Sequence, residues 1–413
     1  MAGGGIYHQG EETTMMPLRV LVISRNYPSP ILPNLGVWAE SLVSAMGKLC
    51  EVRVVAPVPY CPPLPSFIEY ARFRKIPSKE LRNGIEVFHP RFITGPGLSL
   101  HNFEATTFVW SMRANIDELR REFPFDLIHA HFIYPDGAAA ARLARCYRVP
   151  VVISEHAPWL PWLENFPRVQ RQAVWAANES SYLVTGSRYG QQSIAHFIGD
   201  SKKLCIIPIG VNPNLFTLLA EGCQPNLNQI LFVGQINFNK GVDLLLRAMR
   251  VLVKTRPDLR LVLVGGSFYR HKRQQEEKLR ALAQELALEQ QVEFVGEKSP
   301  TEVARFMRES ALVVLPSRAE NFGAVLVEAL ACGTPVIATR CGGPEDIVND
   351  NVGLLVPKED PDALAAGIAS MLNRRATFDS RKLRAYALDN FAWEHIARKY
   401  VNLFEQSLAG RAQ

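Results

Sequence analysis

Continuous apolar runs, rather than alternating ones, recur along this chain and predict strands buried in parallel sheets. In the first half the runs occupy residues 18–24, 51–57, 85–90, 125–131, 149–154, 181–187 and 204–208. In the second half they occupy residues 229–234, 260–265, 292–296, 335–338 and 353–357. Amphipathic segments predict helices at about 37–48, 103–122, 274–288, 361–372 and 393–408. The strand–helix order predicts an α/β fold built of Rossmann-like units.

The length of 413 residues exceeds what one ordinary hydrophobic core supports, so we expect two domains. The segment IIPIGVNPNLF, with Pro208 and Gly210, predicts the hinge between them. Residues 58–83 are rich in proline and aromatic residues, and we expect a long mobile segment without regular structure there. The first 16 residues are expected to form a disordered lead-in.

Composition narrows the functional classes. A hydrophobic content of 47% with 21% charged residues is ordinary for a soluble α/β protein. Seven cysteines without a C-x-x-C pair indicate a reducing cytosol rather than a disulfide framework. The N-terminus lacks the apolar segment of a signal peptide, and no long uncharged apolar window follows, so we expect a cytoplasmic protein.

The net charge of +6 includes basic clusters at 72–75, 142–148 and 270–273. Each cluster is more simply a solvated face than a docking surface. If one of them binds a partner, an anionic bilayer or a phosphate-bearing acceptor fits better than DNA, because no nucleic-acid motif accompanies it. We expect no nucleic-acid partner and keep open a peripheral contact with the anionic inner face of the cytoplasmic membrane.

The stretch from 317 to 347, SRAENFGAVLVEALACGTPVIATRCGGPEDI, carries the densest candidate chemistry. Gly323 lets backbone N–H groups approach a ligand, and the helix that follows points its positive end to the same place, which favours a phosphate. Glu320 and Glu328 lie eight residues apart around this site, and carboxylates suit sugar hydroxyls. Both glutamates also allow a plain interpretation as helix-start and solvated charges. Glu328 fits it poorly, because an unpaired carboxylate within AVLVEALA would be costly.

A second candidate lies in the first half, where the apolar run FDLIHAH ends in two histidines. His129 and His131 are two residues apart, so in a strand both face one side, near its carboxyl end, where α/β sheets bind ligands. They also allow an interpretation as satisfied core histidines. With Asp136 they could in principle bind zinc, but no further close ligand is evident, so we expect no metal site. No G-x-G-x-x-G motif follows the first strand, so no NAD site is expected.

The E-x7-E spacing in ENFGAVLVEALACGTPVIA, with the trailing CGGPEDIV and GLLVP, resembles the family 4 retaining glycosyltransferases of GT-B fold. This resemblance implies two Rossmann-like βαβ domains that face each other across a deep cleft. It implies an acceptor-side domain at 17–208, a nucleotide-sugar-binding domain at 209–390, and a C-terminal helix at 391–413 that packs back on the first domain.

The resemblance also assigns roles to residues. Glu320 would bind the donor sugar's hydroxyls, Glu328 the ribose, and Lys240 the diphosphate. His131 would lie close to the donor sugar and the reacting centre. The arginine that usually precedes this lysine is replaced by Gln235, which cannot offset a phosphate charge or form an ionic fork. Weaker donor binding, an altered donor, or compensation by Arg318 remain open.

The expected site residues fall into three groups. The expected catalytic residues are His131, Glu320 and Lys240. The expected donor-binding residues are Gly36, Gln235, Lys240, Gly265, Gly296, Arg318, Asn321, Phe322, Gly323, Ala324 and Glu328. The expected acceptor-side residues are His156 and Trp159. Gly36 is equally well explained as a turn glycine, and Trp159 as part of a packed loop.

The implied activity is transfer of a hexosyl unit from a nucleotide diphosphate sugar, such as a UDP- or GDP-sugar, to an acceptor hydroxyl with retention of configuration. It would need no metal and no other cofactor, and it would serve polysaccharide, glycolipid or glycoconjugate synthesis. The acceptor would be a glycan, a lipid-linked sugar or a small molecule. Two alternatives stay open: a nucleotide-sugar 2-epimerase, and a non-catalytic homologue that binds a nucleotide sugar.

Overall fold

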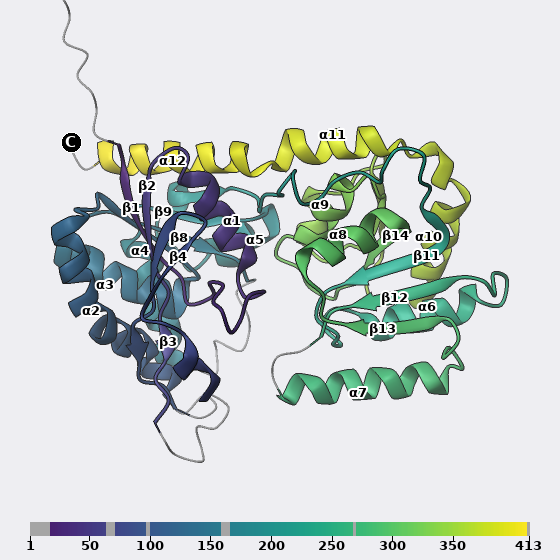
Figure 1. Cartoon of the computed structure of the whole chain (residues 1–413), viewed down its shortest axis with the longest axis horizontal. Coiled ribbons are helices and arrows are strands. Elements are labelled where there is room, and N and C mark those ends of the chain that lie inside the picture. The colour runs from purple at the N-terminus through teal and green to yellow at the C-terminus, as the bar shows by residue number, and fades with distance from the viewer. Residues whose placement is uncertain (1–16, 63–70, 96–99, 158–165, 267–269, 411–413) are drawn as a thin grey trace, which may run out of the picture.

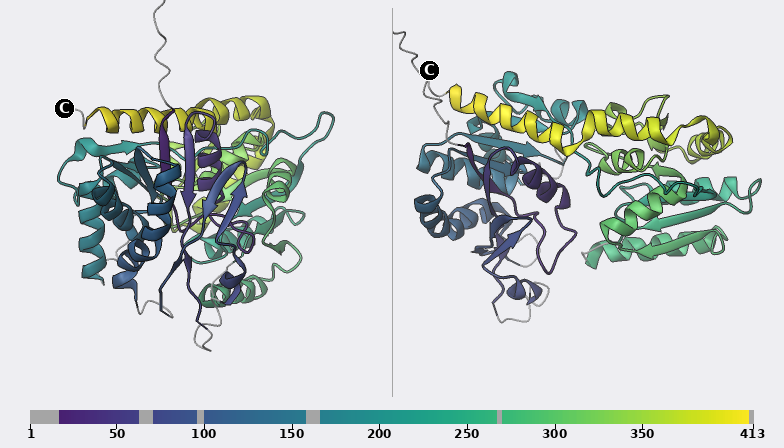
Figure 2. Two further views of the ribbon diagram at one scale, coloured as in Figure 1. Left: turned by 60° about the vertical axis from the view of Figure 1, so that its left-hand side comes forward. Right: turned by 45° about the horizontal axis from the view of Figure 1, so that its top comes forward.

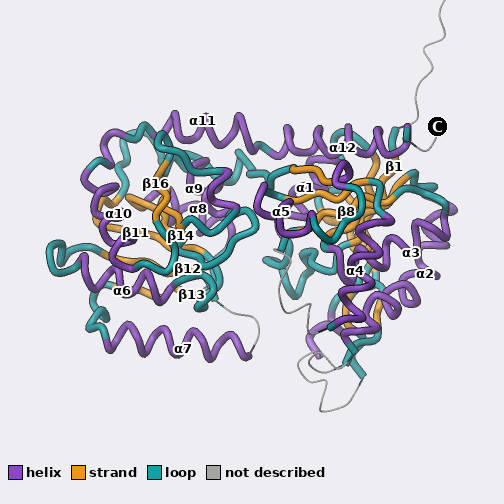
Figure 3. The backbone as a smooth tube through the Cα atoms, turned by 180° about the vertical axis from the view of Figure 1, so that it is seen from behind, coloured by secondary structure: helices purple, strands orange, loops and turns teal. Residues whose placement is uncertain are grey.

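A computed structural model of the chain describes residues 17–62, 71–95, 100–157, 166–266 and 270–410, and shows two parallel sheets, one in each half of the chain (Figure 1). Strands lie inside each half, with helices packed around them (Figure 3). All the apolar runs predicted from the sequence contain a strand. The architecture is therefore α/β with two Rossmann-like sheets, as expected.

The first sheet has eight strands in the order β10-β9-β8-β7-β1-β2-β5-β4, parallel except for the edge pair β4–β5. Its strands are β1 Arg19–Ile23, β2 Glu51–Val55, β4 Lys79–Arg82, β5 Ile85–Phe88, β7 Leu127–His131, β8 Val151–Glu155, β9 Tyr182–Thr185 and β10 Leu204–Ile206. Its helices are α1 Val37–Met46, α2 Glu104–Glu122, α3 Ala138–Tyr147, α4 Pro167–Glu179 and α5 Arg188–Ala195. A separate parallel pair joins β3 Val58–Pro59 to β6 Arg91–Phe92.

The second sheet has six strands, all parallel, in the order β13-β12-β11-β14-β15-β16. These are β11 Asn226–Val233, β12 Arg260–Val264, β13 Val292–Gly296, β14 Ser310–Leu315, β15 Val336–Thr339 and β16 Gly353–Val356. The accompanying helices are α6 Val242–Leu252, α7 Arg270–Glu285, α8 Pro300–Glu309, α9 Ala324–Ala331, α10 Pro361–Asn373, α11 Ser380–Phe391 and α12 Trp393–Ala409. Numbered from β11, the strands follow the order 3-2-1-4-5-6 of a dinucleotide-binding sheet.

Each sheet has one strand at which its winding direction reverses, and ligands bind beyond the carboxyl end of such a strand. In the first sheet this strand is β1, which lies between β7 and β2. In the second sheet it is β11, which lies between β12 and β14. We therefore look for a ligand-binding site in the loops that leave β1, β7, β11 and β14.

The chain passes between the two halves twice, and the two crossings are hydrogen-bonded to each other. The backbone N–H of Val211 donates to the carbonyl of Phe391 at 2.8 Å, and that of Trp393 donates to Val211 at 3.3 Å. Helices α11 and α12 run along one face from the second half to the first (Figures 1 and 2). Buried Tyr400 and Phe404 of α12 join the core of β1 and α1, which confirms the expected helix crossing back.

Two expectations from the sequence were wrong. Residues 58–83 contain regular structure, because β4 pairs antiparallel with β5 and β3 pairs with β6, while residues 63–70 lie outside the described part. The central strand β14 was not predicted, since it starts at Ser310, directly after α8, with no turn residue between them. The lead-in at 1–16 also lies outside the described residues.

In the part of the chain that the structure describes, none of the helices is both long and apolar enough to cross a membrane.

Candidate active site

In the second half, the loops that follow β11 and β14 pack tightly against each other. Gly241, the N-cap of α6, has a φ of 67°, and a Cβ there would lie 1.9 Å from the carbonyl oxygen of Pro316. The N–H of Arg318 donates to the carbonyl of Asn239 at 2.9 Å. Only glycine allows this approach, which brings Lys240 of one loop beside Glu320 of the other.

Lys240 and Glu320 form an ion pair at the centre of this region. Nζ of Lys240 lies 2.5 Å from Oε1 of Glu320, and Oγ of Ser317 donates to the same oxygen at 2.7 Å. Glu320 is 9% exposed, so its charge is largely removed from water. Its second carboxylate oxygen takes no hydrogen bond from the described residues. That oxygen is the one available to a ligand, and Ser317 is a supporting residue that the sequence did not reveal.

Helix α9 begins directly after this ion pair. Its N-cap Gly323 has a φ of 94° and no side chain with which to cap the helix. The N–H of Leu326 donates back to the carbonyl of Gly323 at 2.9 Å, so the N–H groups of Ala324 and Val325, which donate to none of the described residues, are left for a ligand. The ring of Phe322 is buried and points to the hinge, where it meets Phe391 edge-on with 5.9 Å between ring centroids. The backbone of Phe322 lies next to the start of α9, while its ring faces the hinge.

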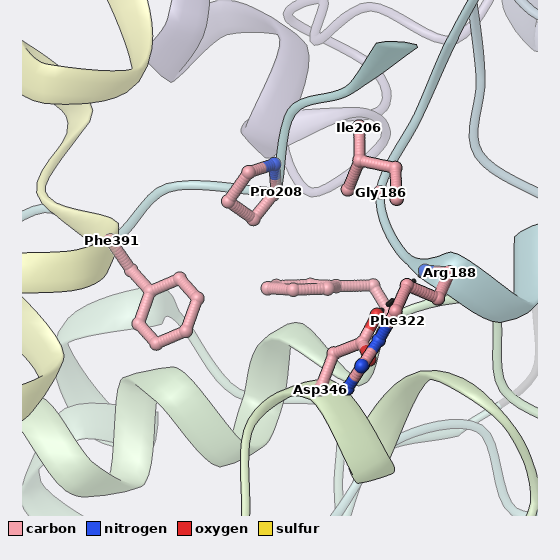
Figure 4. A pocket seen from close by; sticks show the side chains of 7 residues that line it. All are labelled: Gly186, Arg188, Ile206, Pro208, Phe322, Asp346 and Phe391. Atoms are coloured by element: carbon pink, nitrogen blue, oxygen red, sulfur yellow. Dashed lines mark hydrogen bonds and ion pairs between the residues drawn. The ribbon is translucent and has the colours of Figure 1, made fainter. Parts of the chain in front are cut away.

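The hinge region around Phe322 contains a cavity of about 260 Å³ (Figure 4). It is lined by Gly186, Arg188, Ile206, Pro208, Phe322, Asp346 and Phe391. Neither Lys240 nor Glu320 lines it, so it is distinct from the ion-pair region. Its walls come from the first half, the linker and the second half together.

Glu328 lies further along α9, in the second turn. In the part of the chain that the structure describes, its carboxyl group makes no hydrogen bond and no ion pair. Burial raises the pKa of this carboxyl group from 4.5 to about 7. A desolvated acceptor group without a protein partner is a candidate for ligand contact.

Glycines join the carboxyl ends of β11, β12 and β13. Gly265 has a φ of 137°, and a Cβ there would lie 1.8 Å from the carbonyl oxygen of Gly234. Its N–H donates to the carbonyl of Gly296 at 2.9 Å. Gln235 is exposed, and its side-chain oxygen accepts a hydrogen bond from Asn237. Gly265, Gly296 and Gln235 therefore lie together at strand exits, while their contact with a donor stays a prediction.

Arg318 is held within its own domain. Its guanidinium forms two hydrogen bonds to Asp243, at 2.7 and 2.9 Å, and an ion pair with Glu359 at 2.9 Å. The hydrogen bonds to Asp243 raise the pKa of Arg318. Since its charge is already balanced by two carboxylates, the structure does not support Arg318 as a replacement for the arginine missing at Gln235.

The histidines of β7 lie on the face that α12 covers. His129 and His131 are both fully buried, with ring centroids 4.5 Å apart. Nδ1 of His131 lies 3.0 Å from Nε2 of His156, which follows the neighbouring strand β8. Nε2 of His131 is buried without a partner among the described residues. Burial lowers the pKa of His131 to about 3, so the ring is neutral at physiological pH.

A hydrogen-bond chain connects His129 to the last helix. Nε2 of His129 lies 2.9 Å from Oγ of Ser154, and that oxygen lies 3.0 Å from the hydroxyl of Tyr400 in α12. Burial lowers the pKa of His129 and raises that of Tyr400, so all three groups are neutral. This network supports the strand beneath His131.

Glu155 fixes the loops that carry the histidines. Its carboxylate accepts N–H groups from Ile133, His156 and Ala157, each at 2.9 Å. Asp136 plays a similar part, since it accepts the backbone N–H of Arg25 and ties the exit of β7 to that of β1. Burial raises the pKa of Glu155, and it raises that of Asp136 to about 7.

The two halves of the candidate site meet at Asn321. Its side-chain amide donates to the backbone carbonyl of Glu155 at 3.3 Å. Its backbone carbonyl accepts a hydrogen bond from the hydroxyl of Ser187. Arg188 pairs with Asp346 at 2.6 Å beside this contact. The loop that carries Glu320 is thus hydrogen-bonded to the residue preceding His156. This bridging contact was not evident from the sequence, which indicated Asn321 only as a donor-binding residue.

Two further predicted residues have different outcomes. Gly36, with a φ of 71°, is the N-cap of α1, and a Cβ there would lie 1.9 Å from the carbonyl oxygen of Asn26. Tight packing therefore requires a glycine at this position, while its donor contact stays a prediction. Trp159 lies outside the described residues. Trp38, which the sequence did not single out, contacts the ring of His156 with 3.9 Å between ring centroids.

The described part of the chain contains no group of three or more His, Cys, Asp or Glu side chains placed to hold a metal ion. His129, His131 and Asp136 therefore do not form such a group.

The sequence matches two family profiles, described as Glycosyltransferase Family 4 over residues 35–215 and Glycosyl transferases group 1 over residues 220–388. An uncharacterized glycosyltransferase of Methanocaldococcus jannaschii is 31% identical over 290 residues, which cover 68% of this chain and 75% of that protein. D-inositol 3-phosphate glycosyltransferase 1 of Catenulispora acidiphila is 30% identical over 368 residues, which cover 83% of this chain and 86% of that protein.

Solved structures share the fold at low sequence identity. Sucrose-phosphate synthase from Thermosynechococcus elongatus superposes with a TM-score of 0.78 at 21% identity, over 95% of this chain and 100% of that one. Anabaena HepE in complex with UDP-glucose superposes with a TM-score of 0.70 at 19% identity, over 94% of this chain and 100% of that one.

Proposed function

Since this chain belongs to the family 4 glycosyltransferases of GT-B fold, we propose that it transfers a hexosyl unit from a nucleotide diphosphate sugar to an acceptor hydroxyl, with retention of configuration. The observation that carries the proposal is the Lys240–Glu320 ion pair at the start of α9. It combines a cation and helix N–H groups for a diphosphate with a carboxylate for sugar hydroxyls.

In this proposal the second half holds the donor. Lys240 and the start of α9 stabilise the negative charge that develops on the leaving diphosphate. Glu320 orients the sugar through the carboxylate oxygen that Ser317 and Lys240 leave open. Glu328, which has no protein partner in the described part of the chain, takes the ribose hydroxyls. Donor binding lets Lys240 exchange part of its contact with Glu320 for a phosphate oxygen.

The first half meets the sugar from the other side. His131 contacts the sugar as a neutral ring, since burial keeps its pKa near 3. Neither glutamate acts as the general base in this proposal. The leaving phosphate accepts the proton of the acceptor hydroxyl on the same face of the sugar, which preserves the anomeric configuration without a metal ion. The first half also provides the acceptor side, with His156 next to His131.

The comparisons support a nucleotide sugar as the donor, because the similar Anabaena protein was solved with UDP-glucose. We propose a UDP- or GDP-sugar, and a glycan, lipid-linked sugar or small molecule as the acceptor. The inositol 3-phosphate transferases among the relatives make a phosphorylated small acceptor a reasonable first candidate. We place the reaction in the cytoplasm.

The test is to incubate the protein with UDP-, GDP- and ADP-sugars and to measure nucleotide release, first alone and then with candidate acceptors or an acceptor extract. Acceptor-dependent release by the wild type, lost in Glu320→Ala, supports the proposal. Interconversion of the donor without an acceptor would identify an epimerase instead. Tight donor binding without turnover in any mixture would favour the non-catalytic alternative, which the glutamine at 235 motivates.

A further inference from the structure

His131 and His156 share one hydrogen bond between two neutral rings. The two nitrogens lie 3.0 Å apart, and burial lowers the pKa of both imidazoles, so neither ring is charged at neutral pH. One nitrogen of this pair must therefore carry the proton and the other must accept it. Which one donates decides what the opposite nitrogen of His131 offers to a ligand.

The nitrogens outside this hydrogen bond favour one arrangement. Nε2 of His131 is buried and has no partner among the described residues. If His156 donated, His131 would bury an N–H without an acceptor, which is rarer and more costly than a buried lone pair. If His131 donates from Nδ1, the buried nitrogen is an acceptor. The remaining proton of His156 then lies on a partly exposed ring, where solvent can accept it.

We propose that His156 is a positioning residue that holds His131 in the tautomer with its proton on Nδ1, so that Nε2 presents a lone pair to the donor sugar. This inference rests on the proposed function for the identity of the ligand. A lone pair attracts a hydroxyl hydrogen and repels carboxylate and phosphate oxygens. His131 therefore accepts a hydrogen bond from a sugar hydroxyl and does not contact the diphosphate.

The surroundings keep the two rings in place without setting the tautomer. Trp38 packs on both rings, with centroids 3.9 Å from His156 and 5.0 Å from His131. The carboxylate of Glu155 holds the backbone N–H of His156 at 2.9 Å. These contacts fix position, whereas only the hydrogen bond between the rings selects the protonated nitrogen.

The direct test is nitrogen NMR of the full chain labelled in its nine histidines. The His131 signals are assigned by their loss in His131→Gln. We expect the Nδ1–H tautomer in the wild type and a shift to Nε2–H in His156→Leu. His156→Gln should retain Nδ1–H, because its amide oxygen can replace the accepting nitrogen. An Nε2–H tautomer in the wild type, or no change in His156→Leu, would overturn the proposal.

Kinetics give a second readout with the identified donor. We expect His156→Leu to lower kcat about 10-fold with donor affinity within about twofold, because one transition-state hydrogen bond is weakened. His156→Gln should recover most of kcat. His395→Leu, which changes an exposed histidine of α12, is the matched control and should leave both values unchanged. Equal losses in His156→Leu and His156→Gln would refute the positioning role. Absence of turnover in the wild type would instead refute the proposed function, and the spectra would still decide the tautomer.

Discussion

The site's two sides satisfy their polar groups in different ways. On the first-sheet side, His129 reaches Tyr400 through Ser154, His131 bonds to His156, and these groups are neutral. On the second-sheet side, Lys240 and Glu320 carry opposite charges, and Glu328 has no partner among the described residues. If the proposed function holds, the histidine side supplies a fixed shape and the carboxylate side supplies charge for the donor.

The largest loss of activity should follow a substitution on the second-sheet side, at Glu320. Replacing Glu320 with Gln removes the charge but keeps the shape and the hydrogen bond from Ser317. We expect kcat to fall by roughly 10²–10³-fold, the usual loss when a preorganised polar contact to the reacting group is removed. The chain should remain folded by circular dichroism. Glu309→Gln, at a residue of α8 whose side chain is 40% exposed, is the matched control. If Glu320→Gln transferred sugar as fast as the wild type, the charge on the second-sheet side would not be needed for the reaction.

Replacing Glu328 should change the stability of the chain by an amount that depends on pH. Its folded-state pKa of about 7 lies above the ordinary 4.5, so ionisation favours the unfolded chain increasingly as pH rises from 4.5 to 7. That shift sets an upper limit of about 3 kcal/mol at pH 8. The intermediate exposure of Glu328 reduces the expected cost to about 1 kcal/mol. Glu328→Gln should therefore raise the urea midpoint more at pH 8 than at pH 5.

The same variant should weaken donor binding about 10-fold, because an amide offers one acceptor where the carboxylate offers two. Urea titrations at the two pH values and donor titrations check both statements. A stability gain that is equal at pH 5 and pH 8 would contradict the role assigned to the buried charge.

A substitution on the first-sheet side, where the groups are neutral, should change the free energy of unfolding rather than the donor KM. Tyr400→Phe removes the hydroxyl that contacts Ser154 and should lower the free energy of unfolding by about 1 kcal/mol. The donor KM should stay within twofold, because Tyr400 contacts Ser154 and His129 on the first-sheet side. Tyr386→Phe, which removes a hydroxyl bonded to the carbonyl of Ile347 in the second half, is the matched comparison. A large change of donor KM in Tyr400→Phe would show that the two sides are not separate.

The smallest effect should come from the contact between the sides. Asn321→Leu removes the 3.3 Å hydrogen bond to Glu155, whose length places it at the weak end of about 0.5–1.5 kcal/mol. We expect kcat to fall by about two- to fivefold with little change in the midpoint of unfolding. Steady-state kinetics at saturating donor provide the measurement. An effect as large as that of Glu320→Gln would mean that Asn321 contacts the ligand itself.

The sequence predicted the parts of the fold that depend on local pattern. Continuous apolar runs located β1 and β7, and the period of two correctly placed His129 and His131 on one face. The pattern missed β14 because the strand follows α8 without a turn. It missed β4 because three of its four residues are charged and the fourth, Leu81, is exposed.

Contacts in the candidate site depend on pairing between distant segments, which no local pattern records. His131 meets His156 only because β7 and β8 pair with His131 opposite Ser154. Lys240 and Glu320 are 80 residues apart and meet because Gly241 packs against Pro316. The sequence indicated both residues through a family resemblance. Their ion pair, and the bridge from Asn321 to Glu155, required the structure.

Helix α12 has a consequence for biosynthesis. The first sheet is translated early, yet the face of β1 and α1 that Tyr400 and Phe404 cover is closed by α12, which is synthesised after the whole second sheet. A nascent chain that ends before Trp393 therefore exposes an apolar surface on its first domain. The first domain therefore completes its core only after the second sheet has been synthesised, and chaperones that bind apolar surfaces can act on it until then.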